Sequence, residues 1–410
     1  MSTRLSTSLN NDPDPGSAPL EKSGRKRLLT GGGALLSLAL SAMVLAACSS
    51  SPSSSTSTTS SSNTTATTSP TKTLSALETP PTSTVALTET GSTLLYPLFN
   101  LWAPAYNHQY PHISITTAGT GSGTGISQAA AGTVEIGASD AYLSSGQVTQ
   151  YPGLENIPLA ISSQTVDYNL PGLTGTLKLS GQIISQIYQG KITKWNDSKI
   201  AAINPGVSLP STTIVPVHRS DGSGDTFIFT SYLSSADASG WGQSISYGTT
   251  VAFPAVAGAL GENGNGGMVS GCGATPGCIA YIGVSYRNQA MAAHLQEAEI
   301  SNGSGNYEAD TPTTVSAEAA SFAASTPANG TISLISGKKA SNGYPIVNYE
   351  YAIVNTNQAS ATTAQAMKAM LAWALDPSNG SSAAFLNQVN FLPLPTSAIN
   401  VAVGLLNKIS

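Results

Sequence analysis

Short apolar stretches alternate with amphipathic ones from about residue 84 onward. The expected strands lie at 85–87, 112–116, 135–139, 214–217 and 346–354, and the expected helices at 94–106, 126–131, 182–188, 225–233 and 367–374. Pro97 and Pro104 are expected to bend or shorten the first of these helices. Strands that alternate with helices are typical of layered structures, so the pattern predicts an α/β fold.

A different pattern precedes this region. Arg25, Lys26 and Arg27 stand before an apolar run that ends in Leu-Ala-Ala-Cys at Cys48. Basic residues, an apolar segment and then small residues are typical of an export signal, and the ending resembles the bacterial lipobox, whose cysteine becomes lipidated. We therefore predict a lipoprotein signal peptide at 1–47. A plain membrane anchor is the alternative, since about 20 apolar residues span a bilayer; either version leaves the rest of the chain outside.

Residues 48–83 consist mostly of Ser, Thr, Pro and Ala. Such a stretch buries too little apolar surface to offset the entropy that is lost on folding. We therefore predict a flexible tether between the membrane and the folded part of the chain.

The charge balance limits the kind of partner. Only 9% of the 410 residues are charged, and the net charge is −5. Residues 1–47 hold five basic and three acidic residues, so their removal leaves 11 basic and 18 acidic residues and a net charge of −7. A chain of this charge is not expected to bind nucleic acid. Attraction of an anion would have to come from local dipoles and a few arginines.

Two cysteines, Cys272 and Cys278, lie close together in a stretch rich in turn-forming residues. In an exported protein this spacing favours a disulfide. A zinc-binding pair is the weaker alternative, because no histidine or further cysteine lies near.

The run His-Arg-Ser-Asp-Gly-Ser-Gly-Asp-Thr-Phe, from His218 to Phe227, lies between an expected strand and an expected helix. A helix N-terminus presents unpaired N–H groups and partial positive charge to an anion, and Arg219 can add two parallel donors. Similar turns follow strands at Thr93 and Ser122. Taken singly, each turn is more typical of a helix cap or a tight turn. Their coincidence at strand ends, where open α/β sheets bind ligands, favours an oxyanion site.

Asp140 also falls at the end of an expected strand. A carboxylate in an anion site is repulsive unless the ligand brings a proton. Phosphate keeps a proton at neutral pH and sulfate does not, so Asp140 is expected to accept a hydrogen bond from phosphate and to exclude sulfate. Asp221 is placed to pair with Arg219. The alternatives are a turn-capping Asp140 and a solvated Asp221.

Three other functions stay open at this point. One is an exported phosphatase with Ser122 or Ser223 as nucleophile, although neither serine lies in the G-x-S-x-G pattern and the four histidines form no metal-binding motif. Another is a receptor for sulfate or molybdate, which Asp140 disfavours. A role in surface adhesion would leave no readable mark.

Five motifs, in order and together, closely resemble the substrate-binding lipoproteins of bacterial phosphate ABC transporters. They lie at 91–94, 121–123, 137–140, 191–197 and 219–224. The resemblance runs from about Leu87 to the C-terminal helices. It implies a two-lobed periplasmic-binding-protein fold of type II, with two strands that cross between the lobes and the ligand in the cleft between them.

By this resemblance the chain crosses near 166–169 and returns near 346–351. One lobe then comprises 84–167 plus 347–410, and the other comprises 168–346. The implied function is capture of inorganic phosphate outside the membrane and its delivery to an ABC permease. A lipid-anchored monomer without cofactor, metal or enzymatic activity is expected.

The resemblance also assigns the ligand residues. The implied phosphate-binding positions are Thr93, Leu94, Ser122, Asp140, Arg219, Ser223, Gly224, Asp225 and Thr226, with Asp221 orienting the arginine. Leu94 replaces an aromatic residue, which matters little if its backbone N–H is the ligand. Asp225 stands where threonine is common. A second carboxylate could favour a more protonated phosphate, but we expect Asp225 to point away while Thr226 or an amide takes its place.

Overall fold

The computed structural model describes residues 70–335 and 340–410. The expected signal peptide, 1–47, and the expected lipidation site, Cys48, lie outside these residues. The strands are β1 (Val85–Gly91), β2 (Ile113–Gly119), β3 (Ile136–Ser139), β4 (Leu154–Tyr168), β5 (Lys178–Leu179), β6 (Val215–Arg219), β7 (Leu260–Glu262), β8 (Cys278–Gly283), β9 (Gln296–Glu297), β10 (Glu299–Ser301), β11 (Tyr307–Glu308) and β12 (Val347–Asn355).

Helices precede, follow and separate these strands. They are α1 (Pro70–Leu77), α2 (Tyr96–Gln109), α3 (Ser122–Ala131), α4 (Ser145–Gln150), α5 (Gly181–Tyr188), α6 (Ser198–Ile203), α7 (Gly224–Ala236), α8 (Gly264–Gly273), α9 (Arg287–Ala292), α10 (Pro312–Phe322), α11 (Ala361–Leu375), α12 (Ala383–Leu386) and α13 (Thr396–Leu406). The predicted α/β fold is confirmed.

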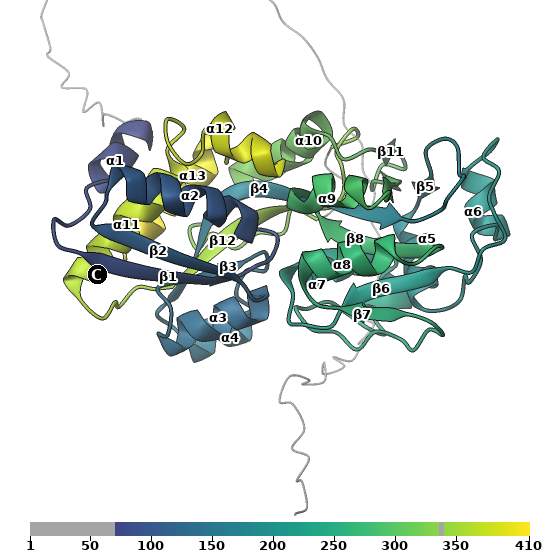
Figure 1. Cartoon of the computed structure of the whole chain (residues 1–410), viewed down its shortest axis with the longest axis horizontal. Helices are drawn as coiled ribbons and strands as arrows, with labels where there is room; N and C mark the ends of the chain where they lie inside the picture. Colours follow the sequence, from purple (N-terminus) through teal and green to yellow (C-terminus); the bar gives the residue numbers. More distant parts are fainter. Residues whose placement is uncertain (1–69, 336–339) are drawn as a thin grey trace, which may run out of the picture. The chain divides into compact units, whose positions relative to one another are not determined.

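One long strand, β4, belongs to two half-sheets. The strand order is β2-β1-β3-β12-β4-β8-β6-β7. Residues 154–163 of β4 pair with β12, and residues 164–168 pair with β8. We call β2, β1, β3, β12 and the first part of β4 the first half-sheet, and the rest of β4 with β8, β6 and β7 the second half-sheet. Figure 1 shows the two sets of strands on either side, with β4 running from one to the other.

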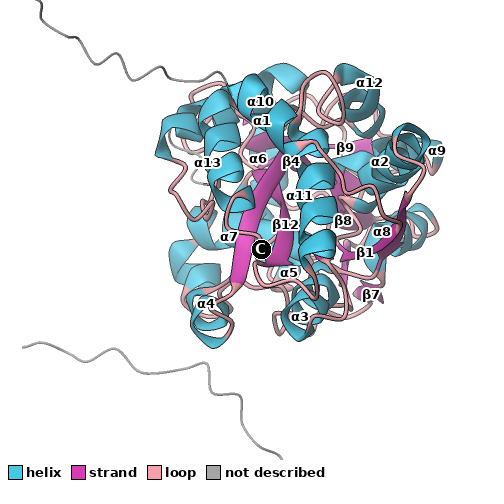
Figure 2. Cartoon of the chain, turned by 90° about the vertical axis from the view of Figure 1, so that its left-hand side faces the viewer, coloured by secondary structure: helices cyan, strands magenta, loops and turns pink. Residues whose placement is uncertain are grey.

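The centre of the core is the pair β4 and β12, which lie side by side (Figure 2). Only Glu155 in β4 and Asn355 in β12 are not buried. Helices α11 and α13 contact β4, and α3 contacts β12. Because both strands are covered, their apolar side chains form a continuous hydrophobic core.

Most of the predicted elements are confirmed, but two details differ. Helix α2 is not shortened at Pro104 but continues through it to Gln109, and Pro97 lies in its first turn, where proline is tolerated. The five buried residues of α2 include Trp102 and Tyr106, so burial outweighs the cost of the interior proline. Residues 260–273, which carry no helical pattern in the sequence, form β7 and α8.

The predicted tether is wrong at its C-terminal end. Residues 70–77 form α1, which contacts α11 and α13, and Leu74 is completely buried. The sequence did not indicate this helix, because a single buried leucine gives no periodic pattern of apolar residues. The division into lobes at 167/168 and 346/347 stays a prediction, although Gln164 N donates to Ile346 O at 3.0 Å, close to both expected crossings.

The predicted disulfide is confirmed. Cys272, near the end of α8, and Cys278, at the start of β8, form a disulfide, with their Cα atoms 5.4 Å apart. Within 70–335 and 340–410, none of the helices has the length and apolar character needed to cross a membrane.

We predict that Leu74→Ala lowers the free energy of unfolding by about 2–4 kcal/mol, because it leaves a cavity between α1 and the two C-terminal helices. Urea denaturation measures this change. The control is Ala76→Ser on the exposed side of α1, which should alter stability by no more than about 0.5 kcal/mol. Equal stability of the two variants would show that α1 does not pack as described.

Candidate functional site

Four helices begin at the junction of the two half-sheets. Helices α2, α3, α7 and α8 follow β1, β2, β6 and β7, and the pairs β1–β2 and β6–β7 are parallel. Several hydrogen bonds join the half-sheets at this point; in two of them Gly123 N donates to Gly222 O at 2.9 Å and Asn265 N donates to Thr93 Oγ1 at 3.2 Å. The junction therefore collects helix N-termini, each with partial positive charge.

Arg219 ends β6, and its side chain is only 1% exposed. Its Nε donates to Asp221 Oδ1 at 2.6 Å and its Nη2 donates to Asp221 Oδ2, a two-point contact that fixes the plane of the guanidinium. Burial opposes the charge of Arg219, but Asp221 and Asp225 outweigh it and raise the pKa of the arginine. Burial works against the charge of Asp221 as well, and Arg219 reverses this, so the pKa of Asp221 is lowered. Both groups are charged.

Asp140 directly follows β3 and is fully buried. Ser92 Oγ donates to its Oδ1, and Ser122 Oγ donates to its Oδ2 at 3.2 Å. Burial raises the pKa of Asp140, while hydrogen bonds from Glu350 and Ser92 oppose the rise. The structure thus presents an acceptor carboxyl at the junction, held by two serine hydroxyls from the ends of β1 and β2.

Glu350, in the middle of β12, is a buried carboxyl that the sequence patterns did not single out. Its Oε1 accepts from Ser162 Oγ, and its buried Oε2 has no donor among the described residues. Burial and the neighbouring charge of Asp140 raise its pKa well above the ordinary value. The raised pKa favours the protonated form of Glu350, and a hydrogen bond between the Glu350 and Asp140 side chains contributes to the rise.

The expectation that the side chain of Asp225 points away is wrong. Its side chain does not point out of the cluster: Oδ2 accepts from Arg219 Nη1 at 2.6 Å and from Asn265 Nδ2 at 2.8 Å, and Oδ1 accepts from Gln164 Nε2 at 3.2 Å. The carboxyl is attracted there by the guanidinium, which Asp221 alone does not saturate. Burial, and then the charge of Asp140, raise the pKa of Asp225 to about 7.

The N-terminus of α7 supplies the next three predicted residues. Ser223 is its N-cap, and Ser223 Oγ accepts from Thr226 N at 3.2 Å. Gly224 lies so close to the first half-sheet that an added Cβ would be 2.4 Å from Asp140 Oδ2 and 2.5 Å from Ser122 Oγ. Thr226 Oγ1 pairs with Tyr281 Oη at 2.8 Å. The hydroxyl of Thr226 therefore has a partner within the second half-sheet.

Thr93 and Leu94 complete the set of predicted positions. Thr93 Oγ1 accepts from Asn265 Nδ2 at 3.0 Å, and the same Asn265 nitrogen donates to Asp225, so the two half-sheets share one amide. Leu94 is completely buried, and its carbonyl accepts from Ser285 Oγ at 2.7 Å. The structure therefore brings the ten positions from Thr93 to Thr226 into one cluster, and only Cys48 falls outside the described residues.

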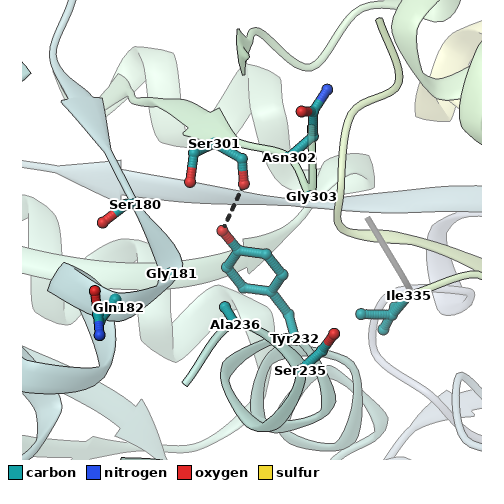
Figure 3. A pocket seen from close by; sticks show the side chains of 10 residues that line it. All are labelled: Ser180, Gly181, Gln182, Tyr232, Ser235, Ala236, Ser301, Asn302, Gly303 and Ile335. Carbon is teal, nitrogen blue, oxygen red and sulfur yellow. Dashed lines mark hydrogen bonds between the residues drawn. The ribbon is translucent and has the colours of Figure 1, made fainter. Parts of the chain in front are cut away.

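Two cavities help to delimit the site. One of about 240 Å³ borders Arg219, Asp221 and Thr226. Another of about 400 Å³, shown in Figure 3, lies under the Tyr232 hydroxyl, which donates to Ser301 O at 3.0 Å. The second cavity shares no lining residue with the cluster, so we place the candidate site at the cluster.

The arrangement suits a small oxyanion that carries a proton. Charged and hydroxyl donors surround the junction, and Asp140 is an acceptor that only a protonated ligand can satisfy. Among the described residues, no group of three or more His, Cys, Asp or Glu is arranged to hold a metal ion.

Sequence reasoning missed Glu350, Asn265 and Gln164. Glu350 could have been noticed as an acidic residue in an expected buried strand, since carboxylates are rarely buried without a partner. Asn265 lies in a glycine-rich stretch whose sequence carries no helical pattern. Nothing in the sequence marks Gln164 beyond its position in a buried strand.

Sequence comparisons place the chain among known proteins. A family model described as a PBP superfamily domain matches residues 52–378. The phosphate-binding protein PstS of Xylella fastidiosa is 33% identical over 326 residues, which cover 78% of this chain and 86% of that protein. The phosphate-binding protein PstS of Methanocaldococcus jannaschii is 32% identical over 318 residues, covering 72% and 79%.

Solved structures agree on the fold. A phosphate-binding protein from Stenotrophomonas maltophilia is 20% identical, with a TM-score of 0.60, and the match covers 77% of this chain and 92% of that chain. A high-affinity periplasmic phosphate-binding protein bound with phosphate is 21% identical, with a TM-score of 0.61 and the same coverage.

The close approach of Gly224 to Asp140 and Ser122 gives a prediction. A Gly224→Ala side chain has no room between the half-sheets, so we expect the free energy of unfolding to fall by about 1–3 kcal/mol. Urea denaturation measures it. The matched control is Gly404→Ala in α13, where an added Cβ meets nothing within 4 Å and helix propensity favours alanine by up to about 1 kcal/mol. Loss of stability in both variants, or in neither, would contradict the tight junction.

Proposed function

The chain belongs to the PBP superfamily and, within it, to the PstS phosphate-binding proteins, and from this premise we propose that it binds inorganic phosphate for uptake by an ABC transporter. The observation that supports the proposal best is the convergence of Arg219 and Asp140. Residues from four separate segments meet there, and together they offer one fixed cation, several neutral donors and one buried proton acceptor, Asp140, to a ligand.

The proposed contacts follow from the geometry. Arg219 neutralises the anion while Asp221 holds its plane. The hydroxyls of Thr93 and Ser223, the backbone N–H of Leu94 just before α2 and the backbone N–H of Gly224 at the start of α7 donate to phosphate oxygens. Ser122, whose hydroxyl donates to Asp140, adds its backbone N–H. The Thr226 hydroxyl is engaged with Tyr281 and its amide with Ser223 Oγ, so Thr226 is the weakest candidate for a direct contact.

Asp140 is proposed to provide the selectivity. It accepts the proton of phosphate, and sulfate has no such proton, so bound sulfate would face an unpaired carboxylate in a buried site. The neighbouring Glu350 is neutral and donates to Asp140, which keeps the second buried carboxyl from adding a repulsive charge.

The family is one of binding proteins, not enzymes, so we assign the chain no reaction and no cofactor. Binding by closure of two lobes, with boundaries at 84–167 plus 347–410 and at 168–346, is part of the proposal. It is supported by β4, which belongs to both half-sheets.

Members of this family work outside the cytoplasm, and for this chain we propose attachment to the outer face of the membrane through a lipid on Cys48. The support is the signal pattern of residues 1–47 followed by Leu-Ala-Ala-Cys. We further propose that the chain acts as a monomer that passes phosphate to permease subunits, without nucleic-acid partners.

The first test is calorimetric titration of the purified protein, stripped of bound ligand, with phosphate and then with sulfate at neutral pH. We expect one-to-one binding of phosphate and no heat from sulfate. In Asp140→Asn, which replaces an acceptor-only group by one that also donates, the preference for phosphate over sulfate should fall at least about tenfold, or about 1.4 kcal/mol.

Each result bears on a different part of the proposal. Folded protein that binds neither anion would refute phosphate binding. Binding of both anions by the unaltered protein, or an unchanged preference in Asp140→Asn, would leave a receptor but remove the role of Asp140.

The lipid anchor has its own test. Cys48→Ala should move the protein from the membrane fraction to the soluble fraction and abolish incorporation of labelled palmitate. Cys278→Ala, which breaks the disulfide but keeps Cys48, should leave membrane attachment intact. If Cys48→Ala stays in the membrane fraction, the N-terminal apolar segment is an uncleaved anchor instead.

A further inference from the structure

Asp225 adds a second acceptor carboxyl to the site, beside Asp140. It is 1% exposed and lies in the first turn of α7, next to Gly224. We propose that Asp225 makes the site select singly charged dihydrogen phosphate, H₂PO₄⁻, over doubly charged hydrogen phosphate, HPO₄²⁻. This inference rests on the proposed function and names the form of phosphate that the site takes.

Arg219 does not need Asp225 for its orientation. Asp221 already binds Nε and Nη2 of the guanidinium. Asp225 takes Nη1, a donor that would otherwise be available to a bound anion. A second carboxylate beside one buried arginine therefore reduces the positive charge that a bound anion meets. This reduction weakens the binding of a dianion more than the binding of a monoanion.

The charged groups that face Asp225 also disfavour a doubly charged ligand. Arg219 from β6 is the cation, and Asp221 neutralises it. Two further carboxyl groups face Asp225, those of Asp140 after β3 and Glu350 in β12. Tyr281 of β8 and Tyr286 just after it are neutral phenols whose pKa values are raised by burial. With Asp140 and Asp225 ionised, the facing groups already sum to a negative charge, so HPO₄²⁻ meets net repulsion.

The protons of dihydrogen phosphate match the acceptor carboxyls of the site in number. Dihydrogen phosphate has two P–OH groups, and the site has two acceptor carboxyls, Asp140 and Asp225. The two remaining phosphate oxygens accept from Arg219, the serine and threonine hydroxyls and the helix N–H groups. HPO₄²⁻ has one proton and leaves one of the two carboxylates facing a bare oxygen.

The proton count of the complex follows. In the complex, Asp225 and the bound phosphate together hold one proton more than ionised Asp225 and HPO₄²⁻ do. This proton lies on a phosphate oxygen or on the carboxyl of Asp225. Above neutrality the free phosphate is HPO₄²⁻ and the free Asp225, whose pKa is about 7, is ionised. Binding must then take up one proton from solvent. Asp140 contributes none, because HPO₄²⁻ itself supplies the proton that Asp140 accepts.

Proton uptake is measured directly by titrating the full protein with inorganic phosphate in two buffers that differ in ionisation enthalpy. At about pH 8 we expect uptake of about one proton, and a dissociation constant that rises about tenfold from about pH 8 to about pH 9. In Asp225→Asn we expect uptake close to zero and a dissociation constant that changes less than about threefold over the same interval.

Glu262→Gln is the matched control, because Glu262 pairs with Arg219 in the ladder of β6 and β7 but its side chain makes no hydrogen bond or ion pair with Arg219 among the described residues. It removes one nearby negative charge and should leave the uptake at about one proton. Loss of uptake in this variant as well would assign the effect to general charge and overturn the role of Asp225.

Other outcomes are equally decisive. Tight phosphate binding by the unaltered protein without proton uptake would overturn the inference while leaving the proposed function intact, and this measurement needs no variant. An uptake of one proton in Asp225→Asn would also overturn it. Absence of phosphate binding at every pH would refute the proposed function instead.

Discussion

The buried guanidinium of Arg219 is the group on which the rest of the site depends. Removing such a charge from water costs several kcal/mol unless partners restore its hydrogen bonds. Asp221 and Asp225 provide them, from the turn after β6 and from the first turn of α7. Because both partners lie within six residues of Arg219 along the chain, the cation is fixed by local structure before the first half-sheet contributes anything.

The first half-sheet then supplies what the arginine lacks. Ser92 and Ser122 hold Asp140, and Gly224 packs against them without a side chain. The strand β4 belongs to both half-sheets and so connects the half-sheet that carries Asp140 to the one that carries Arg219. Few charges are needed elsewhere, which agrees with the low charge content of the chain.

The sequence allowed a good account of this site wherever function lies in local runs. Arg219, Asp221 and the α7 turn are neighbours in the chain, and Asp140 and Ser122 stand at strand ends, so pattern and resemblance found them. Glu350, Asn265 and Gln164 act through tertiary contacts over long separations, which no local pattern records. The same reason explains α1, whose order comes from packing on α11 and α13, and the helix through Pro104, whose cost is offset by buried aromatic side chains.

Four carboxyls share the site, and their partners set the order in which they ionise. Asp221 has a two-point contact with Arg219, and its pKa is lowered. Glu350 has no cation and lies beside Asp140, so it stays protonated. Asp140 and Asp225 fall between these extremes: burial raises the pKa of both, and the charge of Asp140 raises the pKa of Asp225 further. Two ionised carboxylates in one buried site repel each other. A ligand that donates a proton to each of them reduces this repulsion most. The charge balance and the hydrogen-bond geometry therefore point to the same species of phosphate.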